Sequence, residues 1–251
     1  QAEDGIRDVA VTGVQTCALP ISVSSVAISS ATGAQNSTLN AGDVVSVTVT
    51  MSEVVTVTGT PTLTLNVGGT NRTASYVSGS GGTALVFTYA IQAGDTDGNG
   101  ISIVQNGLAN AGGSTIVDAA GNAATLTHAA VADNGLYLVD TTPPATGTLT
   151  LANFIDGGYS NTDFITWDNS FDLALAGNEA GSTVTYQMST DGGTNWSSTV
   201  TAQSNVGDGT YKFRAQVSDA AGNSATSNVV TVTVDTAAPT VSSVAISSAT
   251  G

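Results

Sequence analysis

Apolar and polar residues alternate in short runs along most of the chain, which is the pattern of β-strands that have one face on a core and the other in water. In the clearest run, residues 45–51, valine alternates with serine and threonine. Similar runs cover residues 63–67 and 85–89, and glycine-rich turn sequences such as 79–82 (GSGG) and 97–100 (DGNG) separate them. Short strands at this spacing predict an all-β sandwich.

The second half of the chain continues the alternation and adds two boundaries that contain proline. Segments 139–144 (VDTTPP) and 234–239 (VDTAAP) each end an alternating run with proline, which cannot donate a hydrogen bond to a neighbouring strand. We therefore expect one sandwich over residues 23–142 and another over residues 143–239, joined by a linker that proline stiffens. The runs of the second sandwich lie around residues 149–151, 171–175, 184–188, 211–217 and 230–234.

The chain carries an internal repeat. Residues 23–33 (VSSVAISSATG) recur without change at residues 241–251, so the two copies start 218 residues apart. That offset is the length of two β-domains of about 100 residues each. We expect residues 240–251 to be the first strand of the next repeat, and the chain to be part of a tandem array.

Residues 1–22 (QAEDGIRDVAVTGVQTCALPIS) match no pattern found elsewhere in the chain and resemble a translated sequencing adapter. A secretory signal would need a basic start and a continuous apolar stretch, and this segment has neither. We expect it to be no native part of the protein and exclude it from fold and function. The only cysteine, Cys17, lies within it.

The remaining residues are strongly acidic. Sixteen Asp and Glu side chains stand against three basic ones, Arg72, Lys212 and Arg214. Nucleic acid is an unsuitable partner because phosphate recognition needs clustered Lys and Arg. No stretch has the apolar length of a membrane helix. An acidic, cysteine-free chain fits an exported bacterial protein that meets divalent cations, although acidity also keeps a long array soluble.

Several motifs of the second domain are typical of Ig-like sandwiches. DGTY at residues 208–211 opens a strand in the manner of a tyrosine corner, and Phe213 stands where an antibody domain has its second cysteine. Residues 185–196 (TYQMSTDGGTNW), 208–223 and 232–240 resemble the bacterial Ig-like repeats of large surface adhesins and biofilm proteins, RTX adhesins included. Residues 45–69 and 93–101 resemble the SwmB-type repeat that accompanies them.

This resemblance implies tandem Ig-like β-sandwich domains on the bacterial cell surface. The expected function is a non-catalytic structural repeat, a stalk or spacer in cell adhesion or biofilm formation, whose partners are the neighbouring repeats and, through other domains, a cell-surface glycan or protein. The resemblance also implies that carboxylates near the linkers bind calcium. Two alternatives remain: a module that itself binds a glycan or a protein, and the spacer of a secreted multidomain enzyme.

Carboxylates near the domain boundaries are the candidate calcium ligands. Ca²⁺ takes about six to eight oxygen ligands, so a few converging carboxylates plus backbone carbonyls would suffice. The alternative is that Asp and Asn cap turns by accepting hydrogen bonds from nearby backbone N–H groups. The candidates are Asp140 and Asp235 before the prolines, Asp219 and Asn223 in the second of two DAAGN turns (118–122 and 219–223), and Asp163 and Asp168 in the N-terminal loop of the second domain.

A weaker calcium candidate is DTDGNG at residues 95–100, where Asp95, Asp97 and Asn99 have the spacing that opens an EF-hand loop. The twelfth position is Asn106 instead of Glu, and the residues that follow read as a strand. The pattern therefore favours an ordinary Gly/Asn turn.

No catalytic constellation is recognisable. His128 is the only histidine and has no cysteine or second histidine to complete a transition-metal site, and no G-x-S-x-G motif is present. We therefore expect no enzymatic activity. The aromatic residues Tyr159, Trp167 and Trp196 offer a stacking platform for a sugar, but Trp196 is expected in the core.

Overall fold

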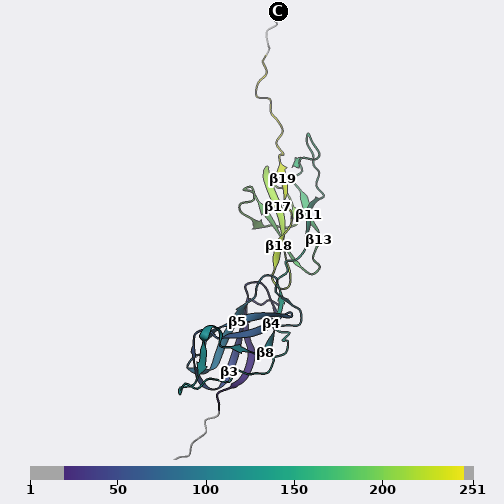
Figure 1. Cartoon of the computed structure of the whole chain (residues 1–251). Coiled ribbons are helices and arrows are strands. Elements are labelled where there is room, and N and C mark those ends of the chain that lie inside the picture. The colour runs from purple at the N-terminus through teal and green to yellow at the C-terminus, as the bar shows by residue number, and fades with distance from the viewer. Residues whose placement is uncertain (1–19, 246–251) are drawn as a thin grey trace, which may run out of the picture.

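The computed structural model describes residues 20–245, which form two β-sandwiches placed end to end (Figure 1). Apart from one short 3-10 turn, η1 (Ala111–Gly113), the regular elements are strands. Within residues 20–245 there is no helix with the length and apolarity that a membrane crossing requires. The predicted all-β fold is confirmed.

The first domain has one large sheet that folds over its own core. Its strands follow the order β1-β3-β6-β5-β4-β8, with β9 on the far part of β3, and a small sheet β2-β10-β7 closes one end. The strands are β1 (Val23–Thr32), β2 (Thr38–Leu39), β3 (Val44–Thr58), β4 (Thr62–Val67), β5 (Thr70–Ser78), β6 (Gly82–Ala90), β7 (Thr96–Asp97), β8 (Ser102–Ala109), β9 (Thr115–Val117) and β10 (Leu138–Asp140).

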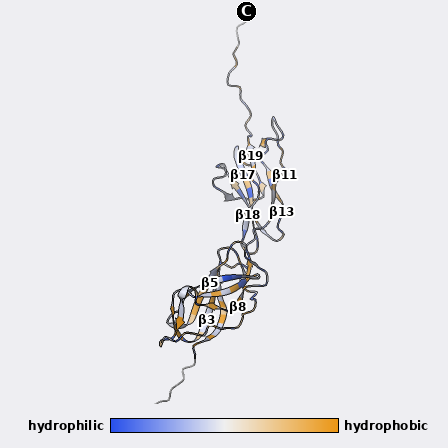
Figure 2. Ribbon diagram, viewed as in Figure 1, coloured by the Kyte–Doolittle hydropathy of each residue, from blue (hydrophilic) through white to orange (hydrophobic). Residues whose placement is uncertain are grey.

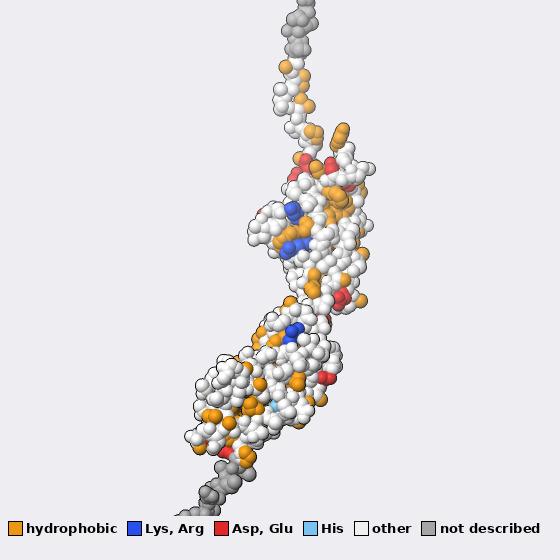
Figure 3. Space-filling view, viewed as in Figure 1, with side chains coloured by type: hydrophobic (Ala, Val, Ile, Leu, Met, Phe, Trp, Pro, Cys, Tyr) orange, Lys and Arg blue, Asp and Glu red, His pale blue; other side chains and the backbone are white. Residues whose placement is uncertain are grey.

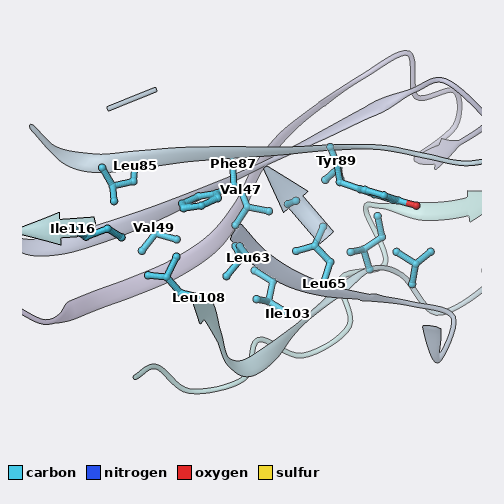
Figure 4. Packing of buried hydrophobic residues seen from close by; sticks show 14 of the residues in the cluster. Val47, Val49, Leu63, Leu65, Leu85, Phe87, Tyr89, Ile103, Leu108 and Ile116 are labelled. Atoms are coloured by element: carbon cyan, nitrogen blue, oxygen red, sulfur yellow. The ribbon is translucent and has the colours of Figure 1, made fainter. Parts of the chain in front are cut away.

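The core of the first domain follows from the alternation along its strands. Val47 of β3 is fully buried, whereas Ser46 and Thr48 beside it lie on the other face. Figure 4 shows the side chains of β3 and β6 directed toward Leu63 and Leu65 of β4, so two layers of one sheet enclose the core. In Figure 2 hydrophobic and hydrophilic positions accordingly alternate along the strands of the first domain.

The exclusion of residues 1–22 from the fold is wrong for two residues. Ile21 is buried in the first core, and its carbonyl accepts a hydrogen bond from the N–H of Thr125 (2.8 Å). Ser22 bonds to Ser52 in both directions. Ile21 lies two positions before Val23, the first residue of β1, so its side chain points to the same face as Val23 and enters the core. Residues 1–19 lie outside the described residues, so the origin of the segment stays a prediction.

The second domain is a sandwich of two sheets with the orders β11-β13-β16 and β12-β19-β17-β14-β15, and β18 pairs with β17. Its strands are β11 (Thr146–Ala152), β12 (Ile165–Thr166), β13 (Phe171–Asn178), β14 (Thr183–Ser189), β15 (Ser197–Ser198), β16 (Ala202–Gln203), β17 (Gly209–Ser218), β18 (Ser224–Thr226) and β19 (Val230–Val234). Residues 241–245, which the repeat predicts as part of a strand, are exposed and have no regular structure here.

Aromatic residues hold the second core together. Phe213 is fully buried and meets Phe171 of the facing sheet edge-on, with 5.8 Å between ring centroids, so an aromatic contact occupies the place of a disulfide. The hydroxyl of Tyr211 donates to the carbonyl of Gly207 (2.9 Å), which confirms the tyrosine corner. The expectation for Trp196 is wrong: its ring is half-buried outside the core beneath the guanidinium of Arg214, because a cation–π contact on the outer face of the sheet replaces core packing.

Candidate functional site at the domain ends

Asparagine side chains bridge the two domains directly. The side-chain amides of Asn36 and Asn40 in the first domain donate to the carbonyls of Ala220 (2.8 Å) and Ala221 (3.0 Å) in the second. In the other direction, the amide of Asn223 donates to the carbonyl of residue 140 (2.9 Å). Bonds from both sides, together with a linker of only residues 141–145 between β10 and β11, fix one domain end on the other.

The turn at residues 219–223 presents these carbonyls because its own polar groups are satisfied internally. Oδ1 of Asp219 accepts the N–H groups of Ala221 and Asn223 (2.9 Å each), and Oδ2 accepts the Asn223 amide (2.9 Å). Gly222 has φ +88°, and a Cβ there would lie 2.1 Å from Nε2 of Gln35 in the first domain. Glycine suits the left-handed backbone, and the groups of the first domain nearest to it are the ends of the Gln35 and Asn40 side chains.

The turn at residues 118–122 has the same sequence and the same hydrogen bonds, but no domain covers it. Oδ1 of Asp118 accepts the N–H groups of Ala120 and Asn122 (2.8 Å each). Hydrogen bonds from the Asn122 side chain and backbone lower the pKa of the Asp118 carboxyl. Ala120 is exposed, whereas the equivalent Ala221 is buried beneath the first domain.

The structure separates the boundary carboxylates into two groups. Asp140, Asp219 and Asn223 lie at the junction between the domains. Asp163 and Asp235 line one hollow at the opposite end of the second domain, where the chain leaves. The parallel pairing of β12 with β19 brings these two together, although 72 positions separate them along the chain.

Most of these carboxylates also cap local turns. Oδ1 of Asp140 accepts the N–H of Thr142 (2.9 Å), and Oδ1 of Asp235 accepts that of Ala237 (3.1 Å). Asp168 holds the loop before β12, since its Oδ2 accepts the N–H of Ile155 (2.8 Å). Such bonds are what the turn-capping interpretation predicts.

One carboxylate that sequence reasoning missed lies beside this hollow. Oδ2 of Asp156 accepts the N–H of Phe164 (3.1 Å), whereas its Oδ1 is buried without a hydrogen-bond partner. An Asp before two glycines carries no stronger signal than an ordinary turn. Among residues 20–245, no three His, Cys, Asp or Glu side chains are placed to hold a metal ion together.

The weaker calcium candidate forms a turn whose oxygens are taken up by amides. The Asp97 carboxylate is buried, and it accepts the N–H groups of Gly68 (2.7 Å) and Gly100 (2.8 Å) as well as that of Asn99 (3.2 Å). The Asn99 amide in turn donates to Asp133. The arrangement matches the ordinary turn that the pattern favoured.

Asp95 belongs to a buried network within the first domain. Its carboxylate forms an ion pair with Arg72 and accepts the Tyr89 hydroxyl (2.5 Å) and the Gln92 N–H (3.0 Å). Burial by itself raises the pKa of the Asp95 carboxyl, but the bonds from Tyr89, Gln92 and Arg72 together hold it below the ordinary value. The pKa of Tyr89 is raised to about 12, mainly by burial and secondly by the hydrogen bond to Asp95.

His128 is part of the framework of the first domain. The N–H of Leu108 donates to its Nε2 (3.3 Å), and its Nδ1 lies 2.8 Å from the carbonyl oxygen of Ala129. Both ring nitrogens are thus occupied by backbone groups.

Comparison with known families identifies the second domain. Residues 142–236 match the bacterial Ig-like domain family. The second domain is a bacterial Ig-like domain. The predicted fold class, tandem Ig-like β-sandwiches, is thereby confirmed. No curated protein matches the chain.

Solved structures with similar architecture include two adhesins. One belongs to a 1.5-MDa bacterial ice-binding adhesin retained at the host cell surface: 15% identity, TM-score 0.37, covering 86% of this chain and 64% of that one. The other is a Ca²⁺-stabilised adhesin with which an Antarctic bacterium binds ice: 18% identity, TM-score 0.37, covering 86% and 49%. Fibronectin(III)-like modules of Clostridium thermocellum CbhA match at 11% identity with TM-score 0.31, covering 84% and 94%. The chain thus spans less than two thirds of either adhesin structure.

Proposed function

We propose that this pair of domains is a non-catalytic structural repeat, a stalk or spacer, of a large extracellular bacterial adhesin that acts in cell adhesion or biofilm formation. The observation that carries the proposal is the bridged junction, in which Asn36 and Asn40 on one side and Asn223 on the other hold the domains end to end. Membership of the second domain in the bacterial Ig-like family supports it.

The junction limits bending for a physical reason. Each sandwich buries its own core, so neither domain needs the other to fold, and the two can be strung together in series. The linker, residues 141–145, contains two consecutive prolines, and Pro144 is buried. Proline fixes its own φ, which removes much of the freedom that a five-residue connection would otherwise have. A series of domains joined with little bending stays extended, which is the property that a stalk requires.

Calcium at the distal end of the second domain is the finer part of the proposal. The Asp163 and Asp235 carboxylates line the hollow there, and the unpartnered Oδ1 of Asp156 lies beside it. Hard carboxylate oxygens suit Ca²⁺, which would supply the positive charge that this end lacks. Backbone carbonyls and the following repeat would supply the remaining ligands. The Asp219 carboxylate at the first junction is instead saturated by N–H donors.

A distance measurement between the domains tests the spacer function. Spin labels on Thr73→Cys and Ser198→Cys, both exposed, with Cys17→Ser to remove the remaining thiol, report the spread of interdomain distances by pulsed electron resonance. We expect a narrow distribution that broadens in Asn36→Ala/Asn40→Ala/Asn223→Ala. The matched control is Asn110→Ala/Asn161→Ala, which alters exposed asparagines away from the junction. A distribution as broad in the parent as in the triple variant would overturn the proposal.

Thermal unfolding with calcium and with a chelator tests the finer part. We expect calcium to raise the melting temperature of the second domain, read by tryptophan fluorescence, and Asp163→Asn/Asp235→Asn to remove the effect. Asp140→Asn, at the other end of the domain, is the control and should keep it. An unchanged melting temperature in the parent would contradict calcium binding and leave the spacer function standing.

A further inference from the structure

Large apolar side chains are exposed together where the chain leaves the second domain. Ile155, Tyr159, Phe164, Ile165 and Trp167 are each between 43% and 109% exposed, and they fall within 13 consecutive residues; we call them the exit surface. Figure 3 shows apolar side chains among acidic ones at this end of the molecule. A concentrated apolar patch on a sandwich that already has a complete core marks a binding surface.

The exit surface is held rigidly. Phe164 stacks on Phe154 at 5.9 Å, and Phe154 meets the core residue Phe171 edge-on at 5.6 Å. The Trp167 indole lies so close to Gly157 that a Cβ there would be 2.4 Å from Nε1. Phe164 also has φ +58°, a costly backbone for a bulky residue, and bonds to Asp156 and from Thr233 hold it there.

The opposite end of the first domain has the matching features. Turn 118–122 repeats turn 219–223 in sequence and hydrogen bonds, yet it is uncovered, whereas turn 219–223 is the acceptor of the established junction. Val54 on the same end is 58% exposed, and Thr56 two residues later pairs with Val117, which precedes the turn. We call Val54 and residues 118–122 the entry surface.

The internal repeat identifies the occupant of the exit surface. Residues 241–251 are identical to residues 23–33, in which β1 begins at Val23, so a further copy of the first domain would start its first strand at residue 241. Six residues separate that position from the end of β19 at Val234, and they can span at most about 25 Å. The entry surface of such a copy would therefore lie next to the exit surface.

We propose that the exit surface docks onto the entry surface of the following copy of the first domain. This inference rests on the tandem array of the proposed function. The apolar side chains would cover Val54 of the copy, and the hydroxyl of Tyr159 and the indole N–H of Trp167 supply donors for its turn carbonyls. The array would thus alternate two joints: one clamped by asparagine amides, the other closed by aromatic packing.

The test extends the full chain at its C-terminus by a second copy of residues 34–142, so that residues 241–251 become the first strand of a complete domain. With Trp196→Phe, Trp167 is the only tryptophan. We expect acrylamide quenching of Trp167 to fall at least twofold relative to the unextended chain. Val54→Asp in the added copy should restore quenching, whereas Leu136→Asp, which is 67% exposed just before β10 at the opposite end of that domain, should not. Tyr159→Ser, a change at a fully exposed side chain, should also restore it and leave the melting temperature unchanged.

Quenching that is equal in the extended and unextended chains would overturn the docking. An oligosaccharide identified on a glycan array could instead protect Trp167 from acrylamide while the added domain does not. That result would assign the exit surface to a sugar and would also overturn the docking. The interdomain distance distribution across residues 141–145 is independent of both results. If the docking fails while that distribution stays narrow, the spacer function stands. If the distribution is broad, the spacer function itself is overturned.

Discussion

Replacing Arg72 by methionine should destabilise the first domain while leaving the second unchanged. Asp95 is 3% exposed, and Arg72 is its only cationic partner among the described residues. The substitution keeps most of the volume of the side chain but leaves the Asp95 charge with only the hydrogen bonds from Tyr89 and Gln92. The substitution therefore measures how much one positive charge next to a buried network contributes to the free energy of unfolding of the first domain.

The expected loss can be bounded from the geometry. Removing one partner of a fully buried ion pair costs about 3–5 kcal/mol. The Arg72 side chain is 33% exposed, so water screens the pair, and its buried Nε has no hydrogen-bond partner, a cost that methionine removes. Both effects lower the expected loss to about 2 kcal/mol. Asp95→Asn in the same chain removes the unpaired charge, so the double variant should recover part of the loss.

Urea unfolding at pH 7 measures this effect, because the two domains have different probes. Both tryptophans, Trp167 and Trp196, lie in the second domain, whereas circular dichroism follows both domains. The free energy of unfolding falls by about 1–3 kcal/mol per molar urea, so the midpoint of the first domain of Arg72→Met should fall by about 1 M. The tryptophan transition, which reports the second domain, should stay in place. A shift below about 0.2 M, or an equal shift of the tryptophan transition, would refute the reasoning.

Acid should reduce the difference between Arg72→Met and the parent. The pKa of Asp95 is lower in the folded parent than its ordinary value of 3.8, so its contribution to stability is present above that pH and is lost as the pH falls through the folded pKa. Once Asp95 is protonated, the variant has no unpaired charge. Urea midpoints compared at pH 7 and pH 3 should therefore converge, and a constant difference would contradict the electrostatic origin.

Three further predictions concern single side chains. Because the pKa of Tyr89 is raised to about 12, its contribution is present below pH 10 and declines as the pH rises towards 12; Tyr89→Phe should remove this part of the alkaline loss in urea midpoints, and an identical pH profile would contradict it. Gly222→Ala and Gly121→Ala have the same φ of +88° and should each cost about 1–2 kcal/mol. Only Gly222→Ala, whose Cβ meets Gln35, should also broaden the interdomain distance distribution; equal broadening in both would speak against the contact. Tyr211→Phe removes the bond to Gly207 and should cost the second domain about 1 kcal/mol by tryptophan fluorescence, so an unchanged midpoint would show that the corner contributes nothing.

Local patterns predicted the elements and several of their details. The alternation over residues 45–51 reappears as buried valines in β3, and DGTY at 208–211 forms the expected corner. The turn at residues 95–100 also follows from its Asp, Asn and Gly residues, whose side chains and backbone bond to near neighbours. In each case the pattern that carries the signal spans a few residues, although the Asp97 carboxylate also accepts the N–H of the distant Gly68.

Trp196 shows where such patterns stop. Its position after a glycine turn is compatible with either face of the sheet, and it lies on the outer face because Arg214 of β17 covers the ring there. Asp156 shows the same limit for the candidate site: nothing in its neighbours distinguishes it from other turn residues, and only the folded loop buries its Oδ1 while Oδ2 accepts the N–H of Phe164.

The sequence by itself therefore determined the β-strands, the positions of the turns and the sandwich class, because a strand's period and a turn's residues are local properties. Only the tertiary structure decided which carboxylates share an end of a domain, and which of two identical DAAGN turns is covered. Asp163 meets Asp235 through the pairing of β12 with β19, and turn 219–223 is buried by residues more than 180 positions away. Apolar alternation states that a face must be buried, but not what will cover it.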